Sequence, residues 1–158
     1  MSGRQIAILW WTRLAILLYA LSACAQKGDV AVVVNAANHT DGVTLSELRK
    51  IFVGERHSWE VGMRIKLIVR RPDAHERTVL LKLMAMSESE YGEYWIAQVF
   101  RGEVDAEPLS LPSLALEEKA LSVFPGGIGF VDAQNVKPEM KVLRVNGHLP
   151  GEPGYPLR

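Results

Sequence analysis

Residues 65–84, IKLIVRRPDAHERTVLLKLM, join a strand pattern directly to a helix pattern. Residues 65–69 are apolar apart from Lys66, which is typical of a strand in a buried sheet. Asp73 and Glu76 then form a cap-like pair, and apolar residues follow at helical spacing: Val79, Leu80, Leu83 and Met84. A strand followed at once by an amphipathic helix is typical of an α/β domain.

The same alternation of strand and helix patterns continues on both sides of this unit. Residues 30–34, VAVVV, form an unbroken apolar run that is typical of a strand buried on both faces. Thr44 and Glu47 are spaced as a capping box, which predicts a short helix ending at Gly54. Further along, the patterns predict helices after Ser87 and Ser113, a long loop over 101–112, and strands over 128–131 and 141–145. We therefore expect an α/β fold with a single mixed, mostly parallel sheet and flanking helices.

The composition indicates one folded domain that no internal disulfide holds together. Hydrophobic residues make up 48% of the 158-residue chain, and Cys24 is its single cysteine. A chain of this length buries about two-thirds of its unfolded surface, which is enough for one core. Residues 25–158 contain 16 basic and 18 acidic side chains, a net charge of −2. This balance gives no indication of a nucleic-acid partner.

Residues 1–24 have the order of an export signal. Arg4 and Arg13 come first, and an uncharged run of ten residues follows over 14–23. Because a membrane-spanning helix needs about 20 apolar residues, this run predicts a cleaved leader rather than an anchor helix. We expect the mature domain to occupy residues 25–158, with a proline-rich tail over 148–158.

The end of the leader, Leu21-Ser22-Ala23-Cys24, resembles the lipobox of bacterial lipoproteins. That resemblance implies cleavage before Cys24, lipid on its thiol and stable attachment to a membrane. The alternative is ordinary signal-peptidase cleavage after Ala25, because Ala23-Cys24-Ala25 also has the small-x-small pattern. Ala25 is not the aspartate associated with inner-membrane retention. We therefore expect a periplasmic protein anchored by lipid, with the outer membrane favoured over the inner one.

The sequence contains none of the motifs that carry common enzymatic chemistry. It has no Gly-x-Ser-x-Gly, no His-Glu-x-x-His and no phosphate loop, and Gly126 to Gly129 is too short for a dinucleotide fingerprint. The four histidines lie far apart without cysteine partners, so we expect no metal site, no cofactor and no enzyme. The aromatic residues at helical spacing are more typical of a core than of a ligand cleft; they are Trp59, Tyr91, Tyr94 and Trp95.

The one stretch whose physics favours a ligand covers residues 70–78, where a strand end meets a helix start. Open α/β sheets bind ligands at that edge, and the free N–H groups of a helix start stabilise an anion. The candidate anion-binding residues are Arg70, Arg71, Asp73, Arg77 and Thr78. The alternative is that Asp73 and Glu76 already cap the first turn and that the arginines are ordinary surface residues.

Four stretches together resemble the small members of the phosphate-type solute-binding proteins of ABC importers. They are residues 44–54 with Trp59, residues 65–71, residues 124–131, and residues 145–147 with 155–157. The resemblance covers nearly the whole mature chain. It implies one lobe of the two-lobed type II periplasmic binding fold. It also implies capture of phosphate or a related oxyanion, without catalysis, for delivery to a membrane complex.

The anion loop of that family has the form Arg-Ser-Asp-Gly-Ser-Gly-Thr-Thr, which Arg71, Asp73 and Thr78 fit. Residues 74–77 depart from it, because Ala-His-Glu-Arg stands where the family has Gly-Ser-Gly-Thr. The family's glycines allow close backbone approach and its hydroxyls are donors, whereas Glu76 puts a like charge beside a bound anion. The chain is also long enough for about one lobe, so water reaches a bound anion and weakens each charge contact.

Two functions remain open from the sequence. The first is a solute-binding-like lipoprotein that holds phosphate or another small anion around Arg71 for an importer or a sensor. The second is a ligand-free lobe that serves as an interaction or scaffold subunit of an envelope complex, with the proline-rich loop and tail as contacts.

Overall fold

The computed structural model describes residues 28–60 and 62–158. The predicted leader over 1–24 and the predicted lipidation site Cys24 therefore lie outside the described residues. Within the described ranges, no helix is long and apolar enough to cross a membrane.

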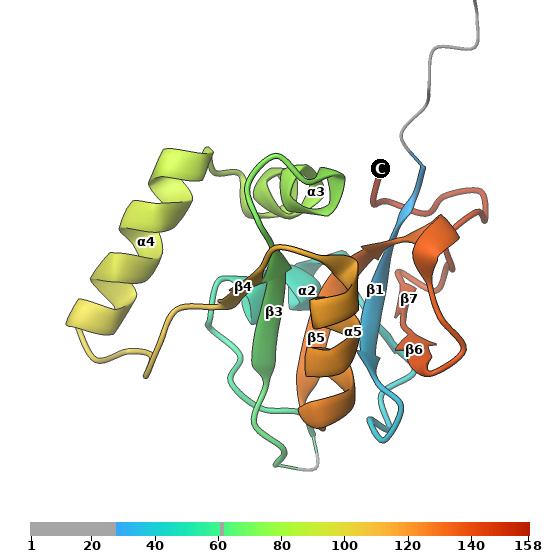
Figure 1. Ribbon diagram of the computed structural model, residues 1–158, viewed down its shortest axis with the longest axis horizontal. Helices are drawn as coiled ribbons and strands as arrows, with labels where there is room; N and C mark the ends of the chain where they lie inside the picture. The colour runs from blue at the N-terminus through green and yellow to red at the C-terminus, as the bar shows by residue number, and fades with distance from the viewer. Residues whose placement is uncertain (1–27, 61) are drawn as a thin grey trace, which may run out of the picture.

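Five strands make one sheet, in the order β4 (Leu109–Leu111), β3 (Lys66–Arg70), β5 (Gly127–Asp132), β1 (Val30–Asn35) and β6 (Met140–Val142) (Figure 1). β3 is parallel to both of its neighbours, whereas β1 is antiparallel to both of its own. Four of the five strands therefore run in one direction, which confirms the mixed, mostly parallel sheet. A separate parallel pair joins β2 (Gly42–Val43) to β7 (Arg144–Val145).

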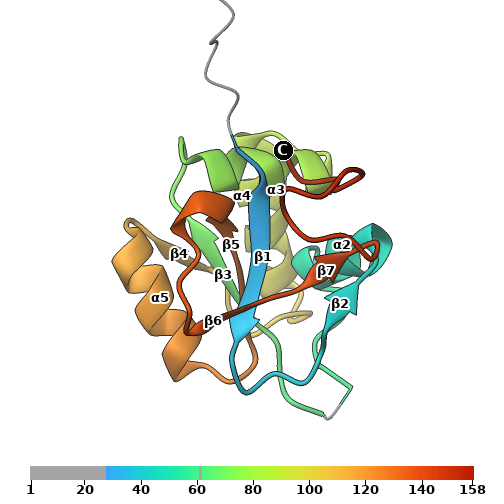
Figure 2. The same ribbon diagram turned by 90° about the vertical axis from the view of Figure 1, so that its right-hand side faces the viewer.

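The helices of the described chain divide between the two faces of this sheet. They are α2 (Leu45–Phe52), α3 (His75–Met84), α4 (Glu88–Phe100), α5 (Leu114–Val123) and a short 3-10 turn, η1 (Ala133–Asn135). α5 lies on one face and α2 on the other, and α3 packs into the same core as α2 (Figure 2). α4 stands beside the sheet, beyond β4 (Figure 1). This arrangement confirms an α/β domain with flanking helices.

Alternate residues of β1 build the two halves of the core. Val30, Val32 and Val34 belong to the larger cluster, with α2, α3 and α4, whereas Ala31 and Val33 belong to the smaller cluster, with α5. All five side chains are fully buried. The predicted strand with two buried faces is therefore confirmed, and it explains why the run lacks the polar alternation of a half-exposed strand.

Two of the predicted helix caps are formed as complete capping boxes. In α2 the Glu47 N–H donates to Thr44 Oγ1 at 3.1 Å, and the Thr44 N–H donates back to Glu47 at 2.8 Å. Ser87 and Glu90 exchange the corresponding bonds at the start of α4. These bonds lower the pKa of both carboxyl groups, because backbone N–H donors stabilise the ionised form.

The predicted cap of α3 by Asp73 and Glu76 is wrong. The residue at the N-cap is Ala74, which makes no side-chain cap bond. Asp73 has φ +71° and follows Pro72 in a turn that the Ala74 N–H closes on Arg71 O at 3.4 Å. A proline followed by a residue with positive φ is the pattern of a type II turn. Asp73 is therefore part of the turn before α3 and does not cap the helix.

Two predicted segments differ from the structure because their strands are very short. The strand expected over 141–145 is divided at Leu143 into β6 and β7, which belong to different sheets. Leu143 is fully buried and its N–H donates to Val32 O at 2.9 Å. The loop expected over 101–112 contains β4, which pairs with β3. Two- and three-residue strands carry too few side chains for an alternation pattern.

The expectation that the aromatic residues are core is confirmed. Trp59 and Trp95 are each 2% exposed, Tyr91 is buried, and Tyr94 is partly buried with its hydroxyl donating to Val53 O. Trp59 Nε1 donates to Gly126 O at 3.1 Å. A Cβ at Gly126 would lie 1.9 Å from Arg64 O, so only glycine fits where the chain at residue 126 passes the backbone of Arg64.

Candidate anion-binding edge and a second pocket

The stretch predicted to bind an anion lies at the carboxyl edge of the sheet. β3 ends at Arg70, the turn over 71–74 follows, and α3 begins at His75 (Figure 1). β4 and β5 are parallel to β3, so their carboxyl ends meet at the same edge. This is the edge at which open α/β sheets bind ligands.

The first turn of α3 presents backbone donors without a side-chain cap. The first helical bond runs from Thr78 N to Ala74 O at 3.1 Å, so the N–H groups of residues 75–77 have no acceptor within the helix. Ala74 has no oxygen with which to cap them. Free N–H groups and the positive end of the helix dipole together favour an anion at this point.

Three of the predicted anion-binding side chains, Arg71, Asp73 and Thr78, are exposed at this edge. The Thr78 hydroxyl donates to Ala74 O at 3.3 Å, one turn into the helix. Asp73 occupies the turn described above and adds a negative charge. Arg71 is therefore the exposed cation of the predicted set.

Arg77 points away from the edge and pairs with α4. Its side chain is 6% exposed, and its Nε and Nη2 donate to Glu88 at 3.1 and 2.5 Å. The guanidinium also lies 3.7 Å from the ring centroid of Tyr91. Burial alone would lower the pKa of Arg77, but Glu88 and Tyr91 outweigh it and the pKa is raised. Burial raises the pKa of Tyr91 to about 12. The geometry assigns Arg77 to holding α3 against α4.

Arg70 points to the opposite face of the sheet, where it meets Glu117 of α5. Its side chain is 14% exposed, and its Nε lies 3.8 Å from Glu117 Oε2. Glu117 is fully buried, and burial raises its pKa to about 8. Glu117 was not among the site residues predicted from the sequence. The available signal was a carboxyl group at helical spacing with Leu114 and Leu121, on the buried stripe of its helix.

The chain ends are tied to this edge by side-chain contacts. His75 Nε2 lies 3.0 Å from Gly28 O, and the Arg158 guanidinium donates to Asp29 at 2.9 Å. Tyr155, 3% exposed, donates its hydroxyl to Val30 O at 2.7 Å. Tyr155 and Arg158 thus fix the proline-rich tail to its own domain.

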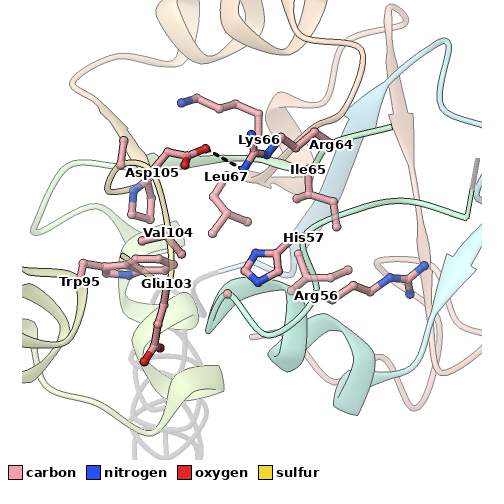
Figure 3. Close-up of a pocket in the computed structure, with 14 residues that line it drawn as sticks. Arg56, His57, Arg64, Ile65, Lys66, Leu67, Trp95, Glu103, Val104 and Asp105 are labelled. Carbon is pink, nitrogen blue, oxygen red and sulfur yellow. Dashed lines mark ion pairs between the residues drawn. The ribbon is translucent and has the colours of Figure 1, made fainter. Parts of the chain in front are cut away.

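A second concave region lies at the other end of β3. It is a pocket of about 350 Å³ between the segment after α2 and the loop after α4, and Figure 3 shows the His57 ring at its centre. Both acidic side chains at its mouth have partners: Asp105 pairs with Arg64 at 2.6 Å, and Glu103 pairs with Arg101 at 2.8 Å. No group of three or more metal-ligating side chains gathers anywhere in the described ranges.

The layers and the strand order define an α/β domain that matches one lobe of the phosphate-type periplasmic binding proteins. No family model and no curated protein sequence matches the chain. Solved structures of phosphate receptors do share its fold.

Three solved structures illustrate the match. An ABC-type phosphate transport receptor from Vibrio cholerae aligns with a TM-score of 0.63 and 21% identity, over 78% of this chain and 48% of that chain. A protein described as a phosphate ABC transporter substrate-binding protein with bound phosphate, from Clostridium perfringens, gives 0.61 and 13%, over 76% and 46%. PstS from Borrelia burgdorferi gives 0.59 and 17%, over 78% and 49%. The chain thus spans about half the length of these proteins.

Proposed function

We propose that this chain is an exported, lipid-anchored protein that holds phosphate or another small oxyanion at the carboxyl edge of its sheet, for an ABC importer or a sensor. Export and lipid at Cys24 rest on the sequence of residues 1–24, and the proposed outer-membrane location rests on Ala25, which is not the aspartate associated with inner-membrane retention. The anion site rests on one observation: the uncapped first turn of α3 directly follows the turn that begins at the exposed Arg71.

In this proposal the backbone does most of the binding. The anion accepts hydrogen bonds from the N–H groups of residues 75–77 and a charge-assisted bond from Arg71. Arg77 acts indirectly, because its pair with Glu88 fixes the first turn of α3. Thr78 and Asp73 lie at the rim of the site, and the charge of Arg70 adds to the local potential. This role requires no metal and no cofactor.

The affinity is expected to be low because the edge is open to water. An exposed charge contact keeps only a small part of the energy it has in a closed site. The loop also lacks the glycines that let a backbone wrap an oxyanion closely. We expect a Kd of roughly 0.1 to 1 mM for phosphate, which corresponds to about 4 to 6 kcal/mol of binding free energy.

Isothermal titration calorimetry of the processed protein tests this proposal. Phosphate, sulfate and small carboxylates are titrated into the wild type, Arg71→Ala and Arg64→Ala. Arg64 is also an exposed arginine, at the other end of β3 in an ion pair with Asp105, and is the control. We expect Arg71→Ala to lose about tenfold in affinity and Arg64→Ala to bind as the wild type does. No heat with any anion, or unchanged binding by Arg71→Ala, contradicts the proposal.

The exposed apolar face of α4 favours the second function. Phe100 is 91% exposed, Ile96 62% and Val99 37%, at positions that share one helical face. Patches of this kind are typical of protein contacts. As the alternative we propose a ligand-free lobe that acts as an interaction or scaffold subunit of an envelope complex. A complex in mild membrane extracts that Phe100→Ser disrupts supports this alternative, whereas a protein that stays monomeric and alone counts against it.

The lipid anchor is tested by fractionation. Replacing Cys24 with serine removes the thiol that would carry the lipid, so the protein is expected in the soluble periplasmic fraction. A Cys24→Ser protein that fractionates with membranes as the wild type does would show that the tether is wrong.

A further inference from the structure

Glu117 is a fully buried carboxyl group without a hydrogen-bond donor among the described residues. It lies on α5, facing the sheet, and neither of its oxygens has a partner there. Gly129 of β5 makes room for it, because a Cβ at that position would lie 2.7 Å from Glu117 Oε1. The glycine therefore leaves the space against the sheet that the Glu117 carboxyl group occupies.

Arg70 lies opposite this carboxyl group without bonding to it. The distance from Arg70 Nε to Glu117 Oε2 is 3.8 Å, which is too long for a hydrogen bond. Nε and Nη1 of Arg70 are buried and have no acceptor in the described chain. A movement of about 1 Å would bring donor and acceptor into bonding range. The pair is therefore open in this structure, and a small movement would close it.

The protonation state of Glu117 decides which arrangement is favoured. A buried carboxylate without donors is costly, so the open arrangement favours the neutral acid. Burial is the main cause of the raised pKa of about 8, and Arg70 of β3 opposes it. Glu76 of α3 and Glu118 of α5 raise it further by charge repulsion. Once ionised, the carboxylate has Arg70 as its adjacent cation.

We propose that Glu117 is a proton-linked positioning residue for Arg70 at the carboxyl edge. When Glu117 is neutral, the charge of Arg70 contributes to the potential at the edge. When Glu117 ionises, it closes the ion pair and draws the Arg70 guanidinium into the gap between α5 and the sheet. For its effect on a bound anion this inference rests on the proposed function, whereas the titration and the closing of the pair do not.

The direct test is NMR of the ligand-free processed protein between pH 4 and 10. The carboxyl carbon of Glu117, assigned by its absence in Glu117→Gln, is expected to titrate with a midpoint near 8. The Nε–H resonance of Arg70, assigned with Arg70→Lys, is expected to move with the same midpoint. In Glu117→Gln that movement is absent, whereas in Glu139→Gln, which removes an exposed carboxylate, it is retained.

Two results of this test overturn the inference. One is a Glu117 midpoint near 4.5, the ordinary value for glutamate. The other is an Arg70 resonance that does not follow Glu117. Both measurements are made on the wild type. If Glu117→Gln fails to fold, through-bond correlation to the backbone amide of Glu117 in the wild type assigns the carboxyl carbon, and Arg70→Lys still assigns the Arg70 resonance.

Sulfate binding gives the functional consequence. The charge of sulfate is constant over this range, so a change in affinity reports on the protein. The wild type is expected to bind sulfate about fivefold more weakly at pH 9 than at pH 6.5, and Glu117→Gln equally at both. Sulfate binding that is independent of pH in the wild type overturns the inference. No sulfate binding at either pH counts against the proposed function, and the NMR titration then decides on Glu117.

Discussion

Arg77 and Arg70, the two arginines next to the carboxyl edge that pack against other helices, differ in how their charges are satisfied. Arg77, on the side of α3 and α4, has two bonds to Glu88 and lies over the ring of Tyr91. Arg70, on the side of α5, lies 3.8 Å from a carboxyl group that is itself buried. Glu88 is 43% exposed, so water reaches its carboxyl group, whereas Glu117 is fully buried. Arg77 therefore holds α3 against α4, whereas in our proposal the position of Arg70 changes with the protonation of Glu117.

The dependence of stability on pH is the largest expected difference between the two sides. The pKa of Glu117 is raised in the folded state, so the folded protein keeps a proton that the unfolded chain releases. This contribution to stability is complete below about pH 4.5 and is lost as the pH rises towards 8, at up to about 1.4 kcal/mol per pH unit. Urea unfolding from pH 4 to 9 is expected to show that loss in the wild type and not in Glu117→Gln.

Glu90 supplies a control of opposite sign. Its pKa is lowered by the bonds from Ser87, so its contribution is present above the unfolded pKa and is lost as the pH falls. Glu90→Gln should therefore change stability mainly on the acid side. If Glu117→Gln and Glu90→Gln change the pH dependence of the unfolding free energy in the same direction, the assignment of a raised pKa to Glu117 is incorrect.

Replacing each arginine by methionine tests the comparison directly. Arg77→Met removes two bonds to Glu88 and a ring contact, and we expect a loss of about 2–3 kcal/mol in unfolding free energy. Arg70→Met at pH 6, where Glu117 is neutral, is expected to cost under about 1 kcal/mol, because no hydrogen bond is lost. Equal losses in urea unfolding would show that the two arginines have the same role.

The glycine beneath Glu117 gives a somewhat smaller effect. In Gly129→Ala the new Cβ would lie 2.7 Å from Glu117 Oε1 and 3.2 Å from Ile68 O, so the carboxyl group must move. We expect a loss of about 2 kcal/mol. Gly92→Ala in α4 is the control, since nothing lies within 4 Å of its Cβ and alanine favours a helix. A tolerated Gly129→Ala would mean that Glu117 is not confined.

The smallest expected effect lies at the end of α3. Ala85 adopts a left-handed conformation, with φ 55°, where glycine is preferred after a helix. Ala85→Gly is expected to raise the unfolding free energy by about 0.5–1 kcal/mol, measured by thermal and urea unfolding. A loss of stability instead would mean that the Ala85 methyl group contributes to the packing of the α3 side.

The sequence predicted those parts of the fold in which one local pattern has one structural outcome. The valine run of β1 is apolar at every position because both faces are buried. Thr44 and Ser87 each stand three residues before a glutamate, and both form capping boxes. In contrast, β2 and β4 are held by pairing with strands far along the chain, which no local pattern reports.

The candidate site was predicted in position but not in detail. Residues 70–78 do join a strand end to a helix start, as their pattern indicated. The direction of each arginine depends on the tertiary structure: Arg77 meets Glu88 eleven residues away, and Arg70 meets Glu117 on another helix. Asp73 has cap-like spacing, but it lies in the turn that follows Pro72. The directions of the two arginines and the position of Asp73 in a turn do not follow from residue spacing alone.

The most direct test of the anion-binding edge is a two-dimensional nitrogen–proton NMR spectrum of the processed protein during addition of phosphate. We predict that the backbone amides of Arg71 and residues 75–77 shift together with one Kd, while the Arg77 Nε–H and the Trp95 indole at the second pocket stay in place. The highest phosphate concentration is 10 mM, about ten times the highest expected Kd. Shifts confined to the second pocket, or an unchanged spectrum at that concentration, would contradict anion binding at the carboxyl edge.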